Sequence, residues 1–213
     1  GQLLQTTPFM TGAGLFVKEG TGDVVMSQTS TYTGGTIILE GRIGLNNGDA
    51  LGTGNIHVVS GAELGIGGIV LNNTISGDGL VRKTATNVGE LYGDNSGFTG
   101  TMYVEEGILF ATDGRSFGSG VLQIDGNAGA EINAGTNTVV SADLAGAGVF
   151  LKTGSGHAVL AGDGSGFAGI VSIINGTLQI EGEQNIGTAA VLINGGSTLQ
   201  LDTAGYSVLS NSV

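Results

Sequence analysis

Short apolar runs separated by glycine-rich turns recur along the whole chain. They lie in matching pairs, at 36–39 and 42–45, at 102–105 and 108–111, and at 171–174 and 177–180. Within each run, every second position is apolar and the positions between them vary, as a strand with one buried face requires. No segment has the 3.6-residue period of a helix. The pattern therefore predicts an all-β chain built from short strands.

The paired runs belong to a stretch that occurs three times. Tyr32, Phe98 and Phe167 each precede a glycine by two positions, and further glycines follow seven and then eleven positions later. We therefore predict one continuous segment over 1–213 that contains three tandem units, at 12–76, 77–145 and 146–213. Residues 1–11 would end a preceding unit. We expect both ends of the chain to cut through a longer array.

Each unit is expected to hold several more strands. One opens each unit, within 12–18, 77–83 and 146–152, and a second follows around Val25, Leu91 and Leu160. Others are predicted at 56–59, 122–125 and 191–194. The last strands should lie near Leu64, Ile132 and Leu199, and near Leu71, Val140 and Leu209.

Strands of this length cannot bury a face alone, but they can if the chain coils and each coil stacks on the one before. A unit of about 67 residues divides into about three coils of roughly 22 residues. The sequence therefore predicts a right-handed parallel β-helix of about nine or ten coils, with a β-sandwich or barrel as the alternative. The expected inward ladder contains four sets of matched positions: Ile38, Val104 and Ile173; Ile43, Leu109 and Leu178; Ile56, Leu122 and Val191; and Val58, Ile124 and Ile193.

Composition narrows the possible functions. The 213 residues include 43 glycines without a three-residue period and a single proline, which excludes collagen. A net charge of −12 argues against nucleic acid and anionic membrane surfaces as partners. There is no cysteine, and therefore no disulfide. No apolar run approaches the roughly 18 residues of a spanning helix, so we expect no membrane insertion of this segment.

Several short motifs are candidates for chemistry. The run from Gly114 to Gly118 fits the Gly-x-Ser-x-Gly elbow of hydrolases, but it falls on a repeat turn where Phe117 matches core residues of the other units. The run from Gly164 to Gly169 fits a dinucleotide fingerprint, but a strand is predicted after it rather than a helix. We expect both runs to be structural turns.

Candidate metal ligands are sparse. Asp94 and Asp163 lie in the turns 93–97 and 162–166, where each offers a single carboxylate, so an Asx-type turn is favoured over a Ca²⁺ loop. His57 and His157 fall in different units and are expected to be exposed and independent. We predict no metal site, no cofactor and no catalytic residue.

Three further sets of residues are candidates for a functional role. Lys18, Lys83 and Lys152 occupy one position in each unit and are expected to pair with a carboxylate or turn carbonyl, with an exposed cationic stripe as the alternative. The repeated aromatics are predicted to be packing plugs rather than a carbohydrate-stacking ladder. The carboxylates that could suggest a glycosidase are Glu105 with Glu106 and Glu181 with Glu183. The first pair faces opposite sides of a strand, and the second has no matched partner.

The unit resembles the passenger-associated transport repeat, also called the autotransporter-associated β-strand repeat. The residues that carry the resemblance are Gly12, Gly14, Lys18, Gly20, Gly22, the run 32–36, Gly41 and Leu45, and in the third unit Lys152, Gly154, Gly156, Phe167, Gly169 and the run 176–178. The middle unit departs from the pattern in its turn at 84–89.

This resemblance implies a passenger of a Gram-negative type V autotransporter, displayed on the cell surface and continued covalently into an outer-membrane β-barrel outside this segment. It implies a non-enzymatic scaffold for adhesion, autoaggregation or biofilm formation that also aids secretion. The partner would be a host or bacterial surface ligand, protein or glycan, or a second copy. Two alternatives stay open: a β-helical polysaccharide lyase or hydrolase, and the stalk of a toxin or protease passenger whose active domain lies elsewhere.

Overall fold

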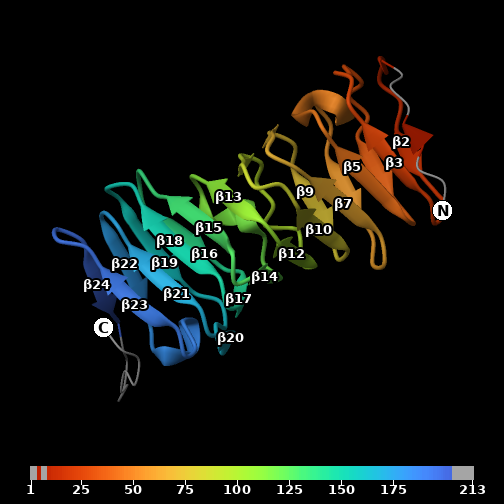
Figure 1. The fold of residues 1–213 in the computed structure, drawn as a ribbon. Helices are drawn as coiled ribbons and strands as arrows, with labels where there is room; N and C mark the ends of the chain where they lie inside the picture. Colours follow the sequence, from red (N-terminus) through yellow and green to blue (C-terminus); the bar gives the residue numbers. More distant parts are fainter. Residues whose placement is uncertain (1–3, 6–8, 203–213) are drawn as a thin grey trace.

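The chain forms an elongated rod of stacked coils, with its two ends at opposite ends of the rod (Figure 1). The structure is a computed structural model, and it describes residues 4–5 and 9–202. The fold is an all-β parallel β-solenoid of about nine turns, as predicted. The strand predicted near Leu209 lies outside the described residues.

Four parallel sheets run along the rod. Sheet A contains β1 (Leu4–Gln5), β3 (Asp23–Met26), β5 (Arg42–Leu45), β7 (Glu63–Ile66), β10 (Leu80–Lys83), β12 (Thr101–Val104), β14 (Val121–Ile124), β17 (Asp143–Gly146) and β20 (Gly166–Phe167). Sheet B contains β2 (Phe16–Lys18), β4 (Thr36–Ile38), β6 (Ile56–Val58) and β9 (Ile75–Gly77).

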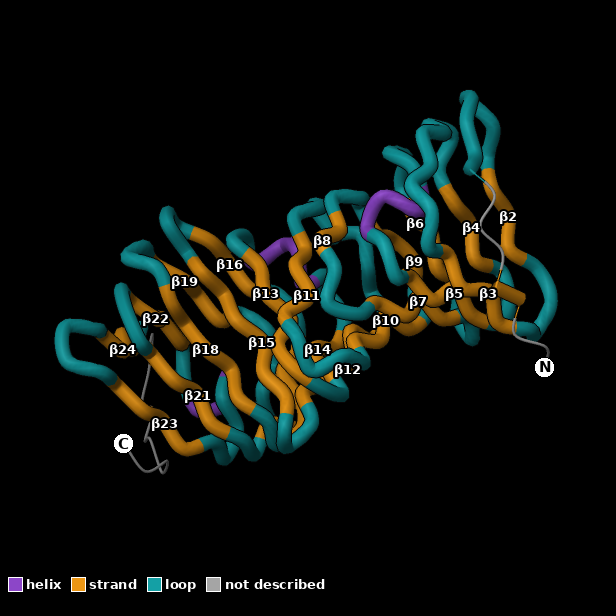
Figure 2. The backbone as a smooth tube through the Cα atoms, turned by 45° about the horizontal axis from the view of Figure 1, so that its top comes forward, coloured by secondary structure: helices purple, strands orange, loops and turns teal. Residues whose placement is uncertain are grey.

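Sheet C contains β8 (Val70–Leu71), β11 (Val88–Leu91), β13 (Gly107–Ala111), β15 (Ala128–Asn133), β18 (Val149–Thr153), β21 (Ile170–Ile173) and β23 (Ala190–Ile193). Sheet D contains β16 (Thr138–Val140), β19 (His157–Leu160), β22 (Thr177–Ile180) and β24 (Thr198–Leu201). Figure 2 shows the strands of sheet C side by side from β8 to β23, and the sheet A strands β3, β5, β7 and β10 likewise side by side. The predicted strands in the described part of the chain lie within a few residues of these positions.

Single 3₁₀ turns are the only helical elements in the described residues. They are η1 (Gly48–Leu51), η2 (Gly114–Phe117) and η3 (Glu183–Asn185). The first two start at an N-cap side chain, because Asn47 and Asp113 each accept a hydrogen bond from the backbone N–H two residues later. Each turn follows the second strand of a repeated stretch, so the repetition in sequence is also a repetition of local structure.

The core is a set of aliphatic ladders inside the coils. The predicted inward residues are buried almost without exception, including Ile38, Val104 and Ile173, which are fully enclosed. Ile193 is the exception, with 39% of its surface exposed. It lies in β23, which pairs only with β21 in the described structure, so no further strand covers that side of it.

The coil is shorter than predicted, and this changes how the units are arranged. In sheet A, Val24 and Leu144 occupy the same row six coils apart, which gives about 20 residues per coil. The predicted coil of roughly 22 residues is therefore too long, and a unit spans about three and a third coils instead of three. The extra third of a coil means that each unit starts on a different side of the rod from the unit before it. Strands that match in sequence therefore lie in different sheets: β4 in sheet B, β12 in sheet A and β21 in sheet C.

Candidate functional site

The three matched lysines are buried at corners of the coil. The Lys18 ammonium group donates to the carbonyl oxygens of Glu19, Gly20 and Glu40, at 3.0, 2.5 and 2.9 Å. The Lys152 ammonium group donates to Thr153, Gly154 and Asn175, at 2.8, 2.8 and 3.0 Å. In both cases the last carbonyl belongs to the next coil. The expected pairing with turn carbonyls is confirmed.

The middle unit keeps this corner although its turn sequence differs. The Lys83 ammonium group donates to the carbonyl of Ala85 and, at 3.0 Å, to that of Glu106 on the next coil. Burial lowers the pKa of Lys83, opposed by the nearby charge of Glu106, and burial also lowers the pKa of Lys152. Since the three lysines lie in sheets B, A and C, they do not form a stripe on one face.

The repeated aromatics are buried plugs, as expected. Tyr32 is 3% exposed, and Phe98 and Phe167 are fully enclosed. The residue after each aromatic donates its N–H to a glycine one coil earlier: Thr33 to Gly12, Thr99 to Gly77 and Ala168 to Gly146, at 2.9, 2.8 and 2.8 Å. Burial raises the pKa of Tyr32, whose hydroxyl lies 2.5 Å from Thr36 Oγ1. No ring of this set is free to stack on a ligand.

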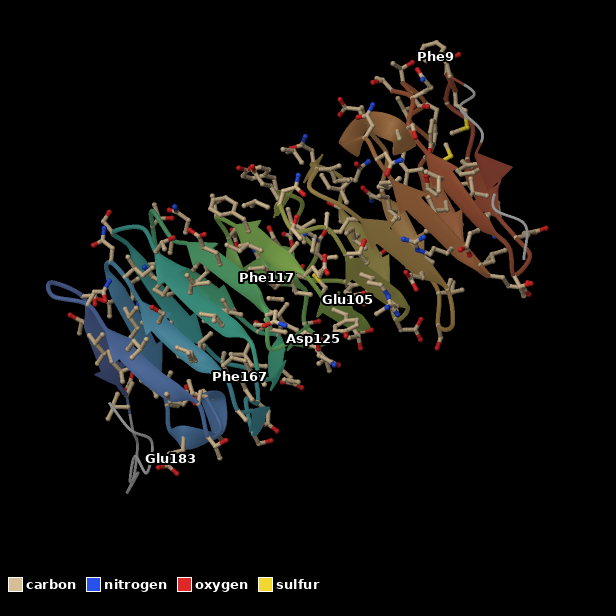
Figure 3. All side chains as sticks on the ribbon, in the orientation of Figure 1. Phe9, Glu105, Phe117, Asp125, Phe167 and Glu183 are labelled. Atoms are coloured by element: carbon tan, nitrogen blue, oxygen red, sulfur yellow. The ribbon has the colours of Figure 1, made fainter. Side chains whose placement is uncertain are left out.

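The serine of the Gly-x-Ser-x-Gly run is in no position to act as a nucleophile. Ser116 is 1% exposed in η2, and its hydroxyl donates to the carbonyl oxygen of Gly93 at 2.9 Å. Phe117, labelled in Figure 3, is fully buried beside it. The element that follows the run is strand β14 rather than an α-helix. The run 164–169 contains the short strand β20 and is likewise followed by a strand, β21, as predicted.

The two aspartate turns are Asx turns. Asp94 Oδ1 accepts the N–H of Ser96 at 3.1 Å, and Asp163 Oδ1 accepts that of Ser165 at 2.8 Å. The hydroxyl and then the N–H of Ser96 lower the pKa of Asp94, and the N–H and then the hydroxyl of Ser165 lower that of Asp163. Within the described residues, no group of three or more histidine and acidic side chains is placed to hold a metal ion.

The histidines differ from each other in exposure. His57 is exposed in β6, and its Nδ1 lies 3.1 Å from Ser76 Oγ. His157 is half-buried in β19, and its Nε2 is enclosed without a hydrogen-bond partner. The expectation that both are exposed is therefore wrong for His157, because this residue begins a strand whose next residue, Ala158, is in the core. They lie in sheets B and D, and so are independent.

The paired carboxylates do not converge. Glu105 forms an ion pair with Arg82 at 3.3 Å, whereas the backbone carbonyl of Glu106 accepts from Lys83. Glu181 lies before η3, where its N–H donates to Asn185 Oδ1 at 2.9 Å, and Glu183 begins the turn. Glu105 and Glu106 therefore join one coil to the next, whereas the contact of Glu181 stays within its own coil.

A ladder of charges on the outer face of sheet A was not predicted. Glu63 lies 2.9 Å from Arg42 and 3.3 Å from Arg82, and the Arg82 guanidinium stands 5.3 Å from the centre of the Tyr103 ring. The Tyr103 hydroxyl in turn donates to Asp125 at 2.5 Å, which raises its pKa. Figure 3 labels Glu105 and Asp125 near this ladder. The correct coil period would have revealed it, because such side chains recur about one coil apart.

With this ladder and the lysine corners, almost every lysine and arginine of the chain has been given a partner. Arg115, the remaining one, pairs with Asp94 and Asp113, each at 2.8 Å. All six lysines and arginines lie in the described residues, and all six are engaged in the joints between coils or on the surface.

Comparison with known proteins agrees with this architecture. The passenger-associated-transport-repeat family matches residues 16–43 and 150–180, the first and third of the repeated stretches. An uncharacterized lipoprotein, YdeK, from Escherichia coli (strain K12) is 28% identical over 91% of this chain. The adhesin BmaC autotransporter from Brucella suis biovar 1 (strain 1330) is 30% identical over 87% of it. No solved structure matches.

The chain spans 16% of the length of the lipoprotein and 4% of that of the adhesin. The described part of the chain holds no helix with the length and apolar character that a membrane span needs. The matched stretches coincide with the lysine corners and aromatic plugs of two units. The chain is thus a β-solenoid segment of autotransporter-passenger type that carries passenger-associated transport repeats, and it is a distant homologue of an autotransporter adhesin.

Proposed function

We propose that this chain is a non-enzymatic part of a passenger on the surface of a Gram-negative cell, where the rod presents an adhesive surface for attachment, autoaggregation or biofilm formation. The observation that carries the proposal is that the candidate polar side chains form structural hydrogen bonds. The side chains that the sequence marks as candidates for chemistry, such as Ser116 and the three lysines, are engaged in joining one coil to the next. A hydrolase or lyase would need a convergent set of accessible acids and bases.

The homology to an adhesin supports the same proposal. We infer that the outward strand positions, which differ between units, meet a surface ligand or a second copy, because the inward positions are occupied by the core. We also propose that the full protein continues into an outer-membrane β-domain, which would place this rod outside the cell.

The rod would also aid secretion. Each coil buries its aliphatic ladder against the coil before it, so a coil that emerges at the cell surface gains stability as soon as it stacks. The lysine corners strengthen this step, because each ammonium group binds a carbonyl of the next coil.

An in-frame deletion tests the adhesive role. The full-length protein and a form without this segment should be expressed in the same strain, with surface display checked by protease treatment of intact cells. We expect the deletion to reduce sedimentation of aggregated cells and retention on a surface while display is maintained. Unchanged aggregation and attachment with equal display would contradict the proposal.

A further inference from the structure

The outer face of sheet C carries several exposed aliphatic side chains. Its strands pair in register from β8 to β23, so their outward side chains form two rows that run along the rod. The first row contains Val88, Ile108, Gly129, Val149, Ile170 and Ala190. The second row contains Val70, Glu90, Phe110, Glu131, Leu151, Ser172 and Leu192.

This face is accessible at several points along its length. Val70 is 44% exposed, Val88 43%, Ile170 36% and Leu192 52%, whereas Ile108, Phe110, Val149 and Leu151 are half-buried. Exposed apolar side chains gathered on one face favour an interaction site over an ordinary solvated surface. The sheet A face, by contrast, carries the ladder of paired charges.

A notch interrupts the first row at Gly129. A cavity of about 390 Å³ opens there, and its lining includes Ile108, Val149 and Leu151. A β-carbon added to Gly129 would approach the end of the Leu151 side chain at 3.2 Å. Leu151 therefore reaches over Gly129, and an apolar side chain of a partner would be received in the part of the cavity that Ile108, Val149 and Leu151 line.

The charges on this face are of one sign. Glu90 and Glu131 are its only ionisable side chains in the two rows, and they lie on either side of Phe110. Each accepts a hydroxyl hydrogen bond, from Tyr92 at 2.7 Å and from Thr153 at 2.6 Å. Neither has a basic partner, because all six basic side chains are engaged elsewhere. A second copy would bring carboxylate against carboxylate, whereas a cationic partner would neutralise them.

We propose that the outer face of sheet C binds a cationic amphipathic helix of another protein, which lies along the rod with an apolar side chain in the notch at Gly129 and basic groups at Glu90 and Glu131. The spacing fits. Glu90 and Glu131 are two strands apart, about 9.6 Å, and helix residues seven positions apart are separated by about 10.5 Å. Seven strands span about 29 Å, close to the roughly 27 Å of an 18-residue helix.

This inference deepens the proposed function, because it names the partner class of the adhesive surface. The test is a binding titration with the purified 213-residue chain. The probe is a helical peptide of about 18 residues with leucines on one face and lysines beside them, and a peptide with glutamates in place of the lysines is its control. We expect the lysine peptide to bind and the glutamate peptide not to bind.

Variants locate the site. Glu90→Gln with Glu131→Gln, and separately Leu151→Ser, should each raise Kd for the lysine peptide by about tenfold, equivalent to about 1.4 kcal/mol. Gly129→Ala, which fills part of the notch at an ordinary backbone conformation, should raise Kd as well.

The matched controls are Glu19→Gln with Glu40→Gln, which remove the same charge from exposed corners, and Val159→Ser on sheet D. They should leave Kd within about twofold. Circular dichroism and unfolding curves show whether each variant is folded.

Three outcomes would overturn the inference. The first is that the lysine peptide does not bind. The second is that the control variants weaken peptide binding as much as the sheet C variants do, which would mean that net charge alone attracts the peptide. The third is that the chain dimerises through this face in sedimentation, that Leu151→Ser abolishes the dimer, and that the peptide has no effect on it. The deletion experiment on cells is independent of all three. If the peptide does not bind but the deletion reduces aggregation, this partner is rejected and the proposed function stands. If the peptide binds but the deletion has no effect on aggregation or attachment, only the proposed function is rejected.

Discussion

The ammonium group of Lys152 donates a hydrogen bond of 3.0 Å to the carbonyl oxygen of Asn175, which lies 23 residues later and one coil further along the rod. Its other two bonds stay within its own coil, at Thr153 and Gly154. One side chain therefore closes a corner and joins it to the next. The same joint recurs at Lys18 and Lys83, on two other sheets.

Replacing this lysine tests the joint. Lys152→Met should lower the free energy of unfolding by about 1–3 kcal/mol, because methionine keeps the apolar stem but leaves the buried carbonyls without their donor. Urea unfolding followed by circular dichroism measures the change. Arg115→Met, which removes a cation that is 58% exposed, is the control and should cost at most about 1 kcal/mol. Equal losses in the two variants would show that the corner contributes nothing of its own.

The glycine that faces this corner should be sensitive to a single methyl group. Gly176 has φ of 72°, and a β-carbon there would lie 2.4 Å from the Gly156 carbonyl oxygen and 2.9 Å from Lys152 Nζ. Gly176→Ala should cost more than about 1 kcal/mol from backbone strain alone. Gly135→Ala, at an ordinary φ with open space around it, should be close to neutral. If both alanines were tolerated equally in thermal unfolding, the corner geometry would be wrong.

Strand positions and the inward ladder could be predicted from the sequence, because a buried row must be apolar in every coil. The number of coils per unit could not. Stacking requires only that like residues meet in space, and nothing requires a unit to hold a whole number of coils. Because the observed coil is slightly shorter than the predicted one, a unit contains an extra third of a coil, and each unit starts on the next side of the rod. This offset therefore separates Lys18, Lys83 and Lys152 onto three sheets instead of one.

The joints were predictable only in part. A lysine at a fixed place beside a turn indicated pairing with carbonyls, and the turn aspartates indicated Asx bonds. The charge ladder of Arg42, Glu63 and Arg82 depends on the register between coils. The half-buried state of His157 likewise depends on where its strand starts, which glycine spacing alone does not fix.

A pair of substitutions on one strand tests the assignment of faces. Ile173 is fully buried and Ser172 points outward in β21. Ile173→Asp should destabilise the chain by several kcal/mol, in the range of about 2–7 kcal/mol for an unpaired polar group in the core. Ser172→Asp should change the unfolding free energy by about 0.5 kcal/mol or less. Wild-type-like unfolding of the Ile173 variant would contradict the inward assignment.

Acid should weaken the cluster around Arg115. Its hydrogen bonds hold the pKa of Asp113 below the ordinary value of 3.8, whereas the pKa of Asp94 is lowered mainly by Ser96 and only secondarily by the charge of Arg115. Because the folded pKa is the lower one, the unfolded chain takes up protons first as pH falls. The stabilisation is therefore complete above pH 3.8 and is lost as pH falls through the lowered folded pKa.

Arg115→Gln isolates this effect. The difference in unfolding free energy between the wild type and the variant should be present at pH 7 and shrink steadily below pH 4. Lys152→Met supplies the comparison, since its difference should not depend on the titration of these aspartates. A difference for Arg115→Gln that is the same at pH 7 and pH 3 would exclude the ion-pair explanation.

The central claim is a continuous parallel solenoid whose coils contain about 20 residues, so that successive units turn by one side of the rod. The chain has no cysteine, so nitroxide labels can be attached at two introduced cysteines only. Val88→Cys and Ile170→Cys place labels on exposed positions of one row, four coils apart. Electron–electron double resonance should give one narrow distance, consistent with a backbone separation of about 19 Å. A distance above about 30 Å, or a broad distribution, would contradict this stacking of coils.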